Sequence, residues 1–101
     1  MADKIEAVAG EVKVELSRLY PIDGAETNEV TDTKTGKKKK VTVLRLKELN
    51  GYDNVAMSKE IENGKLAGYL QISASAGITY EEALSLFDTD SSKVAEAIQG
   101  F

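Results

Sequence analysis

The spacing of hydrophobic residues along the chain changes near residue 46. Before this point apolar residues alternate with polar ones, most clearly at Val12, Val14 and Leu16, which is the period of a half-buried β-strand. Residues 26–33 are rich in Thr and Val, and residues 39–46 contain several β-formers. The pattern predicts strands over 11–19, 26–33 and 39–46. The simplest arrangement is a three-stranded antiparallel meander, with the second and third strands forming a hairpin that extends beyond the sheet.

After residue 46, apolar residues recur every three or four positions, as on one side of a helix. The first predicted helix begins between 47 and 53 and ends at Asn63-Gly64, and the second ends at Gly77. Thr79 and Glu82 have the spacing of a capping box and predict a third helix. Residues 88–92 form a second capping segment ahead of the last helix. Gly68, inside the second helix, is expected to mark a close helix–helix contact.

These elements predict one α+β domain over residues 11–101. A small antiparallel β-meander or hairpin occupies the N-terminal half (11–46), and three or four short helices follow (47–101). Residues 1–10 are expected to form a flexible N-terminal tail, because Gly10 ends their short helical pattern.

The amino-acid composition includes few residue types suited to catalysis. The 101 residues include no His and no Cys, which excludes a Ser-His-Asp triad, a disulfide framework and a thiolate metal site. Asp88 and Asp90 lack the ligand spacing of a calcium loop, and Glu81 and Glu82 are explained by their place in a first helical turn. We therefore expect a protein that is not an enzyme and that has no catalytic residue, metal or cofactor.

Charge is mildly acidic, at −4 overall, so nucleic acid and membrane are not expected partners. The exception is the run Lys37–Lys40, which could contact phosphates or an acidic protein. The alternative, which we favour, is a solvated hairpin tip whose lysines discourage pairing between strand edges. No apolar block resembles a signal peptide or a membrane span, which predicts a cytoplasmic protein.

The helical stripes contain more apolar residues than one small core can hide. Part of them is expected to form a partner-binding groove or a self-association face. The candidate partner-binding residues are Leu66, Tyr69, Leu70, Tyr80, Leu84, Phe87, Ile98 and Phe101.

The order of these motifs resembles a known family. The segments that carry the resemblance are 20–26 (YPIDGAE), 43–49 (VLRLKEL), 66–70 (LAGYL), 78–84 (ITYEEAL) and a closing helix of about ten residues. Over about residues 11–101 they are similar to the small tail assembly chaperones of tailed bacteriophages. The charged insert at 33–40 departs from the compact hairpin expected for that family.

The resemblance implies a non-enzymatic chaperone in the cytoplasm of the host bacterium. Such a chaperone binds the long helical tape-measure protein during tail assembly, keeps it soluble and helps to recruit tail-tube protein. Homo-oligomers are compatible with this role. The alternative function is that of a structural virion subunit, in the tail tube or the head–tail connector. That subunit would self-assemble through strand edges and the hairpin at residues 31–40.

Overall fold

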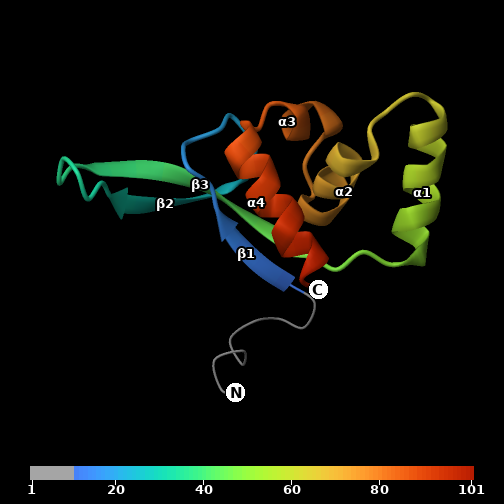
Figure 1. Ribbon diagram of the computed structural model, residues 1–101, viewed down its shortest axis with the longest axis horizontal. Helices are drawn as coiled ribbons and strands as arrows, with labels where there is room; N and C mark the ends of the chain where they lie inside the picture. Colours follow the sequence, from blue (N-terminus) through green and yellow to red (C-terminus); the bar gives the residue numbers. More distant parts are fainter. Residues whose placement is uncertain (1–10) are drawn as a thin grey trace, which may run out of the picture.

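The computed structural model describes residues 11–101, and the predicted tail at 1–10 lies outside them. Three strands are followed by four helices, which confirms the α+β class (Figure 1). The elements are β1 (Glu11–Glu15), β2 (Glu26–Thr31), β3 (Lys38–Lys47), α1 (Gly51–Glu62), α2 (Ala67–Ala76), α3 (Tyr80–Leu84) and α4 (Asp88–Gln99).

The sheet is antiparallel, and its order is β1-β3-β2. The predicted hairpin of the second and third strands is correct, but the predicted meander order is wrong, because β3 lies in the centre. β3 is the longest strand, with ten residues, and five of them are buried. β2 has no buried residue. A central position suits the most apolar strand, because β1 pairs with one of its edges and β2 with the other.

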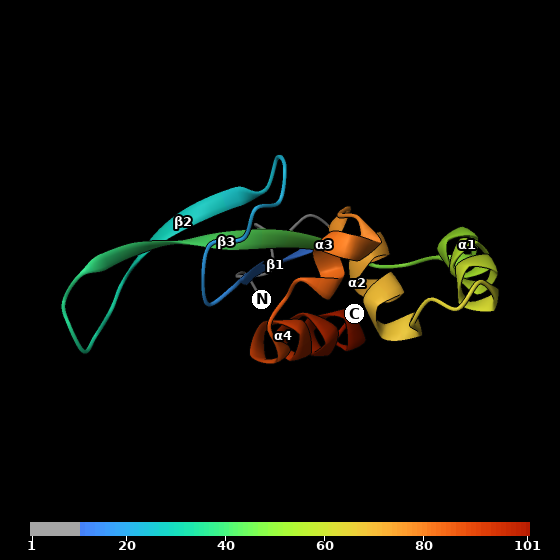
Figure 2. The same ribbon diagram turned by 90° about the horizontal axis from the view of Figure 1, so that it is seen from above.

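The hairpin extends beyond the rest of the sheet, as its sequence predicts (Figures 1 and 2). β1 pairs with β3 only from Val43 to Lys47, whereas β2 pairs with β3 from Lys38 to Val43. The two ladders therefore overlap at a single β3 residue. Beyond it β2 and β3 continue as a two-stranded ribbon that ends in the turn at residues 32–37.

β1 ends at Glu15, earlier than predicted, because the chain bulges outward at Ser17 and Arg18. The Leu16 N–H donates to the Thr42 carbonyl (2.9 Å), and the Thr42 N–H donates back to the Arg18 carbonyl instead of the Leu16 carbonyl (3.0 Å). The Thr42 hydroxyl, which is fully buried, accepts from the Tyr20 N–H at 2.7 Å. This side-chain bond replaces the ladder where regular pairing stops.

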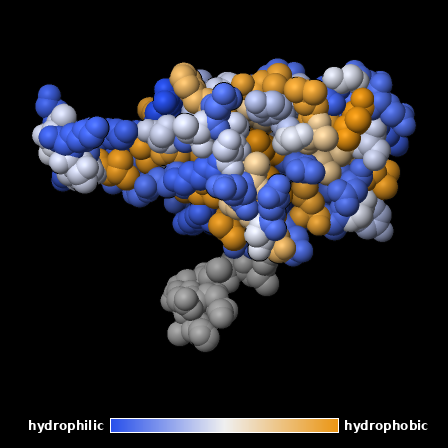
Figure 3. Space-filling model, in the orientation of Figure 1, coloured by the Kyte–Doolittle hydropathy of each residue, from blue (hydrophilic) through white to orange (hydrophobic). Residues whose placement is uncertain are grey.

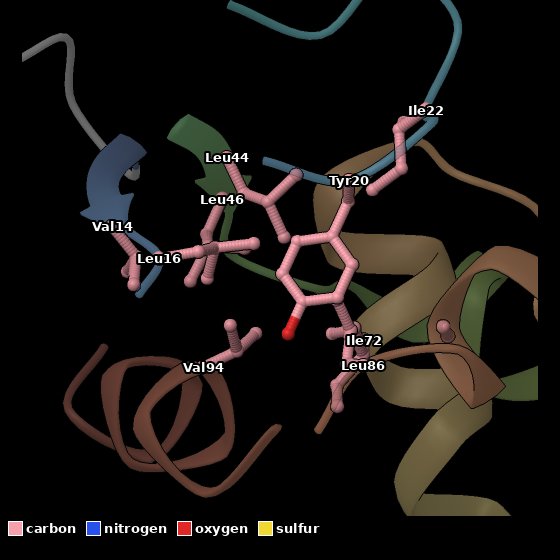
Figure 4. Packing of buried hydrophobic residues seen from close by; sticks show 10 residues of the cluster. Val14, Leu16, Tyr20, Ile22, Leu44, Leu46, Ile72, Leu86 and Val94 are labelled. Carbon is pink, nitrogen blue, oxygen red and sulfur yellow. The ribbon is translucent and has the colours of Figure 1, made fainter. Parts of the chain in front are cut away.

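The main core lies between one face of the sheet and the helices (Figures 2 and 4). α4 packs along β1 and β3, while α2 packs on β3, α3 and α4. The central residues of the core come from both strands and the three helices named here, and from the segments that follow β1 and α3. They are Val14, Leu16, Tyr20, Ile22, Leu44, Leu46, Ile72, Ala83, Leu86 and Val94.

The opposite face of the sheet is covered by charged side chains instead of a second layer. Glu26 accepts hydrogen bonds from Lys13 (3.3 Å) and Arg45 (3.0 Å), and these bonds lower the pKa of its carboxyl. Val41 and Val43 are buried on this face, which is consistent with long charged side chains covering them with their apolar stems. This face therefore presents paired charges to solvent.

The helix boundaries follow the predicted signals in most places. α1 begins at Asn50, which forms a capping box with Asp53, and α3 begins with the predicted box of Thr79 and Glu82. Gly77 ends α2 with a left-handed φ of 70°.

Two details of the helix prediction are wrong. The residue before α4 is Phe87, and no side chain of the 88–92 segment caps that helix. Gly68 makes no close helix–helix contact, since a Cβ atom there would meet nothing within 4 Å.

Candidate partner-binding surface

The eight predicted binding residues do not form one continuous stripe. Leu66, Leu84, Phe87 and Phe101 are exposed, whereas Tyr69, Tyr80 and Ile98 are half-buried. Leu70 is buried and lies near Met57 of α1, outside the main core, so it is not available at the surface. Tyr69 and Ile98 pack against the edge of the core.

Four of the residues belong to α3, follow it closely in the chain or are hydrogen-bonded to it, and we call this set the α3 ridge: Leu66, Tyr80, Leu84 and Phe87. The Tyr80 hydroxyl accepts from the Leu66 N–H at 2.9 Å, which joins the start of α2 to the start of α3. Leu84 lies one helical turn after Tyr80. Leu66, Leu84 and Phe87 are 58%, 45% and 55% exposed. In the space-filling view, hydrophobic residues appear over the helical half (Figure 3).

Two cations flank the α3 ridge. The Arg18 guanidinium lies 3.8 Å from the centroid of the Phe87 ring, and the Lys65 ammonium lies 5.3 Å from that of Tyr80. Lys65 also donates a hydrogen bond to Glu60, which raises the pKa of its ammonium group. An apolar strip suits the apolar face of an amphipathic helix, and its charged border is mixed, since Glu81 and Glu82 lie in the first turn of α3 beside these cations.

A buried polar network holds the α3–α4 corner against β1. Asp90, which is 2% exposed, accepts from the Ser17 N–H (2.9 Å), the Ser17 hydroxyl (2.7 Å) and the Tyr20 hydroxyl (2.5 Å). The same Tyr20 hydroxyl accepts from the Phe87 N–H at 3.1 Å. The network therefore fixes both the strand bulge and the backbone that carries Phe87.

The electrostatics of this network favour an ionised Asp90 and a neutral Tyr20. Burial alone would raise the pKa of Asp90, but the hydrogen bonds from Tyr20 and Ser17 outweigh it, so the net pKa lies below its ordinary value. For Tyr20, burial and the hydrogen bond to the Asp90 carboxylate both raise the pKa of the phenol.

α1 carries exposed apolar residues that the sequence did not single out as a binding surface. Tyr52 is 89% exposed, Val55 is also exposed, and Met57 is the only buried residue of the helix. α1 lies at the end of the molecule opposite the hairpin tip and packs mainly on α2 (Figure 1). Its helical spacing gave the same signal as a core-facing helix, so exposure could not be told from the sequence.

A half-open pocket of about 330 Å³ lies beside the edge of β3. Apolar side chains of Ile22, Val43 and Ile78 contribute to its lining, together with the backbone near Gly24 and Gly77. Asp23, Glu26 and Arg45 also line the pocket, and Arg45 donates a hydrogen bond to Glu26.

The lysine-rich segment lies at the far end of the hairpin, on the second part of the turn and the start of β3. Lys37 to Lys40 are all exposed. Lys38 lies 4.0 Å from Glu29, and Lys39 donates to the Ser17 carbonyl at 3.0 Å.

Among residues 11–101, no group of three or more acidic residues is placed to hold a metal ion. In the same range no helix is long and apolar enough to cross a membrane. Comparisons of the chain with protein-family models, with curated proteins and with solved structures found no match.

Proposed function

We propose that this chain is a tail assembly chaperone of a tailed bacteriophage that binds the tape-measure protein. The proposal starts from the resemblance of the segments around residues 20–26, 43–49 and 78–84 to that family. The observation that carries it in the structure is the α3 ridge. Three large apolar side chains stay exposed there while a complete core forms beneath them.

An exposed apolar strip is what a helix-binding chaperone needs. The tape-measure protein is a long helical protein, and the apolar face of a helix aggregates if it stays in water. Leu66, Leu84 and Phe87 are exposed, and the Asp90 network fixes the backbone that carries Phe87. A pre-formed strip binds at a lower ordering cost than a flexible one.

The test is co-expression of the chain with the tape-measure protein encoded near it, followed by pull-down. Leu66→Gln with Leu84→Gln is expected to reduce the retained tape-measure protein at least ten-fold, a loss of about 1.4 kcal/mol or more in binding. Val55→Gln is the matched control, because Val55 is an exposed aliphatic residue on α1. Circular dichroism should show the same helix content in all three proteins.

The outcomes separate the two apolar surfaces. Loss of binding in the Val55 variant alone would move the site to α1. Undiminished binding in the Leu66/Leu84 variant would contradict the role of the α3 ridge. If the wild-type chain does not retain the tape-measure protein at all, the chaperone proposal is wrong.

A second function, a structural subunit of the virion, is favoured by one observation. The β2–β3 ribbon projects from the body, and within the described residues β2 pairs only with β3. Such an edge can pair with another chain. Light scattering at several concentrations distinguishes the two functions. Rings or tubes of the chain alone favour the structural subunit, and small species that co-purify with the tape-measure protein favour the chaperone.

A further inference from the structure

Charge is strongly separated along this molecule. Residues 31–40, at the tip of the hairpin, contain five Lys and one Asp. Residues 48–101, which form the helical half, contain nine Asp and Glu and three Lys. The formal charges are thus +4 at the tip and −6 over the helices. The acidic helical half therefore attracts positively charged segments such as the hairpin tip.

The two charged regions lie far apart within one copy. The longest extent of the molecule is 47 Å, and the hairpin tip and α1 occupy its two ends (Figure 1). The Debye length at physiological ionic strength is about 8 Å. Attraction between the tip and the far helices of the same copy is therefore screened. The tip can reach the helices only on another copy.

Several charged groups in both regions form no salt bridge with any of residues 11–101. Within the part of the chain that the structure describes, no salt bridge involves Lys34, Lys37 or Lys40 on the hairpin. Glu62 at the end of α1 and Glu81 in α3 also form no salt bridge there, although Glu81 lies near enough to Lys65 to help raise the pKa of that ammonium group. All five are exposed, so they can form ion pairs across an interface without a large desolvation penalty.

The hairpin itself gains from a contact. Beyond Thr42, towards the tip, the ribbon has only two strands, and among residues 11–101 no third strand pairs with it there. A two-stranded ribbon is marginally stable in water. Docking against another surface would order it.

We propose that this chain associates with a second copy of itself, with the lysine-rich hairpin tip of one copy docked against the acidic helical half of the other. The two surfaces differ, so the contact is heterologous. It closes into a ring if the rotation between copies permits, and otherwise it extends as a chain. Small oligomers formed in this way are compatible with the chaperone, whereas a large ring or a long chain would also support the structural subunit.

The first experiment measures the average mass of the full chain by light scattering over a wide concentration range, at low and at physiological salt. The mass is expected to rise with concentration and to fall as salt is added. A wild-type chain that stays monomeric at every concentration in low salt overturns the proposal.

Two matched variants then locate the contact. Lys37→Glu and Lys59→Glu make the same charge change, and neither lysine has a salt bridge among residues 11–101. Lys37→Glu is expected to weaken association several-fold, because it removes a cation from the tip. Lys59→Glu makes the helical half more acidic and should leave association unchanged or stronger. Equal effects of the two substitutions would mean that only net charge matters and would overturn the proposal.

A charge exchange provides the strictest test. One variant carries Lys34→Glu and Lys37→Glu, and the other carries Glu62→Lys and Glu81→Lys. Each alone should stay monomeric where the wild type associates, and an equimolar mixture should associate again. Association that survives both pairs of changes but is lost in Leu66→Gln/Leu84→Gln would place the contact on the α3 ridge and refute the hairpin contact. Retention of the wild-type chain on DNA, lost in Lys34→Glu/Lys37→Glu without any change in mass, would refute it in favour of nucleic acid.

Discussion

Replacing Asp90 by alanine tests the idea that one buried carboxylate joins α4 to the strand bulge. The substitution removes the acceptor of three hydrogen bonds, two from Ser17 and one from Tyr20. Ser17 is exposed, so its donors can turn to water. The Tyr20 hydroxyl is buried and would lose its acceptor. An unsatisfied buried donor costs about 1–3 kcal/mol, and a hydrogen bond to a charged group contributes about 1.5–3 kcal/mol.

Because these terms overlap, we expect Asp90→Ala to reduce the free energy of unfolding by about 3 kcal/mol. Tyr20→Phe should cost about 2 kcal/mol, since the Phe87 N–H also loses its acceptor. The double variant should cost less than the sum by about 1 kcal/mol or more, since both changes remove the same bond. Urea unfolding followed by circular dichroism measures all three values, with the urea dependence unchanged.

Asp88→Ala is the matched control. Asp88 lies in the same first turn of α4 but is exposed, so its loss removes only a favourable interaction with the helix dipole, about 0.5 kcal/mol. If Asp90→Ala costs no more than Asp88→Ala, or if the two positions 20 and 90 are additive, the network does not hold α4 in place and the reasoning fails.

The same network makes stability depend on pH in a defined direction. The pKa of Asp90 is lowered in the folded chain, so its stabilising effect is present above the ordinary carboxyl pKa and is lost as pH falls through the lower, folded-state value. The pKa of Tyr20 is raised, so its effect is present below the ordinary phenol pKa and is lost as pH rises through the higher value. The wild type and Asp90→Ala should therefore differ by a constant amount near neutral pH and converge in acid.

Two further substitutions test local features of the helices, each by the midpoint of thermal or urea unfolding. Gly68→Ala should stabilise the chain by about 0.5 kcal/mol, because the position is helical and a Cβ atom there meets nothing. A destabilised variant would show that the glycine is needed for a contact the structure lacks. Thr79→Ala should cost about 1 kcal/mol, because the capping box at the start of α3 loses its acceptor for the Glu82 N–H. No loss there would mean that packing alone holds α3.

Local signals predicted most of the elements correctly. Alternation at Val12, Val14 and Leu16 marked the first strand, and Thr79 with Glu82 marked the start of α3 at the observed residues. These features depend only on neighbours within one turn or one strand, so the sequence displays them directly.

Strand order and the inward turn of Asp90 could not be predicted in this way. Both β1 and β2 can pair with β3, and the choice depends on packing against helices that come later in the chain. Asp90 resembles a capping residue in any sequence, because an acidic residue in a first helical turn is common. Its partners Ser17 and Tyr20 lie 73 and 70 positions away. No local sequence pattern predicts contacts between residues so far apart in the chain.

The α3 ridge is exposed because the core beneath the helices is small. The helices cover only one face of the sheet, and paired charges cover the other. The core therefore has room for only part of the apolar side chains. Ala83 and Leu86 are buried in it, whereas Leu84 and Phe87, which have the same spacing, remain exposed. Exposed apolar residues therefore lie on the helical half, whereas exposed cations lie on the hairpin tip.

The apolar α3 ridge and the cationic hairpin tip differ in chemistry and lie in different places, so one chain can bind in two ways. Binding of a helical partner through the α3 ridge should be insensitive to Lys37→Glu and weakly sensitive to salt. Self-association through the hairpin should respond strongly to both. Pull-down and light scattering on Leu84→Gln, Lys37→Glu and the double variant measure the two activities separately. Effects that always change together would show that the two surfaces form a single interface.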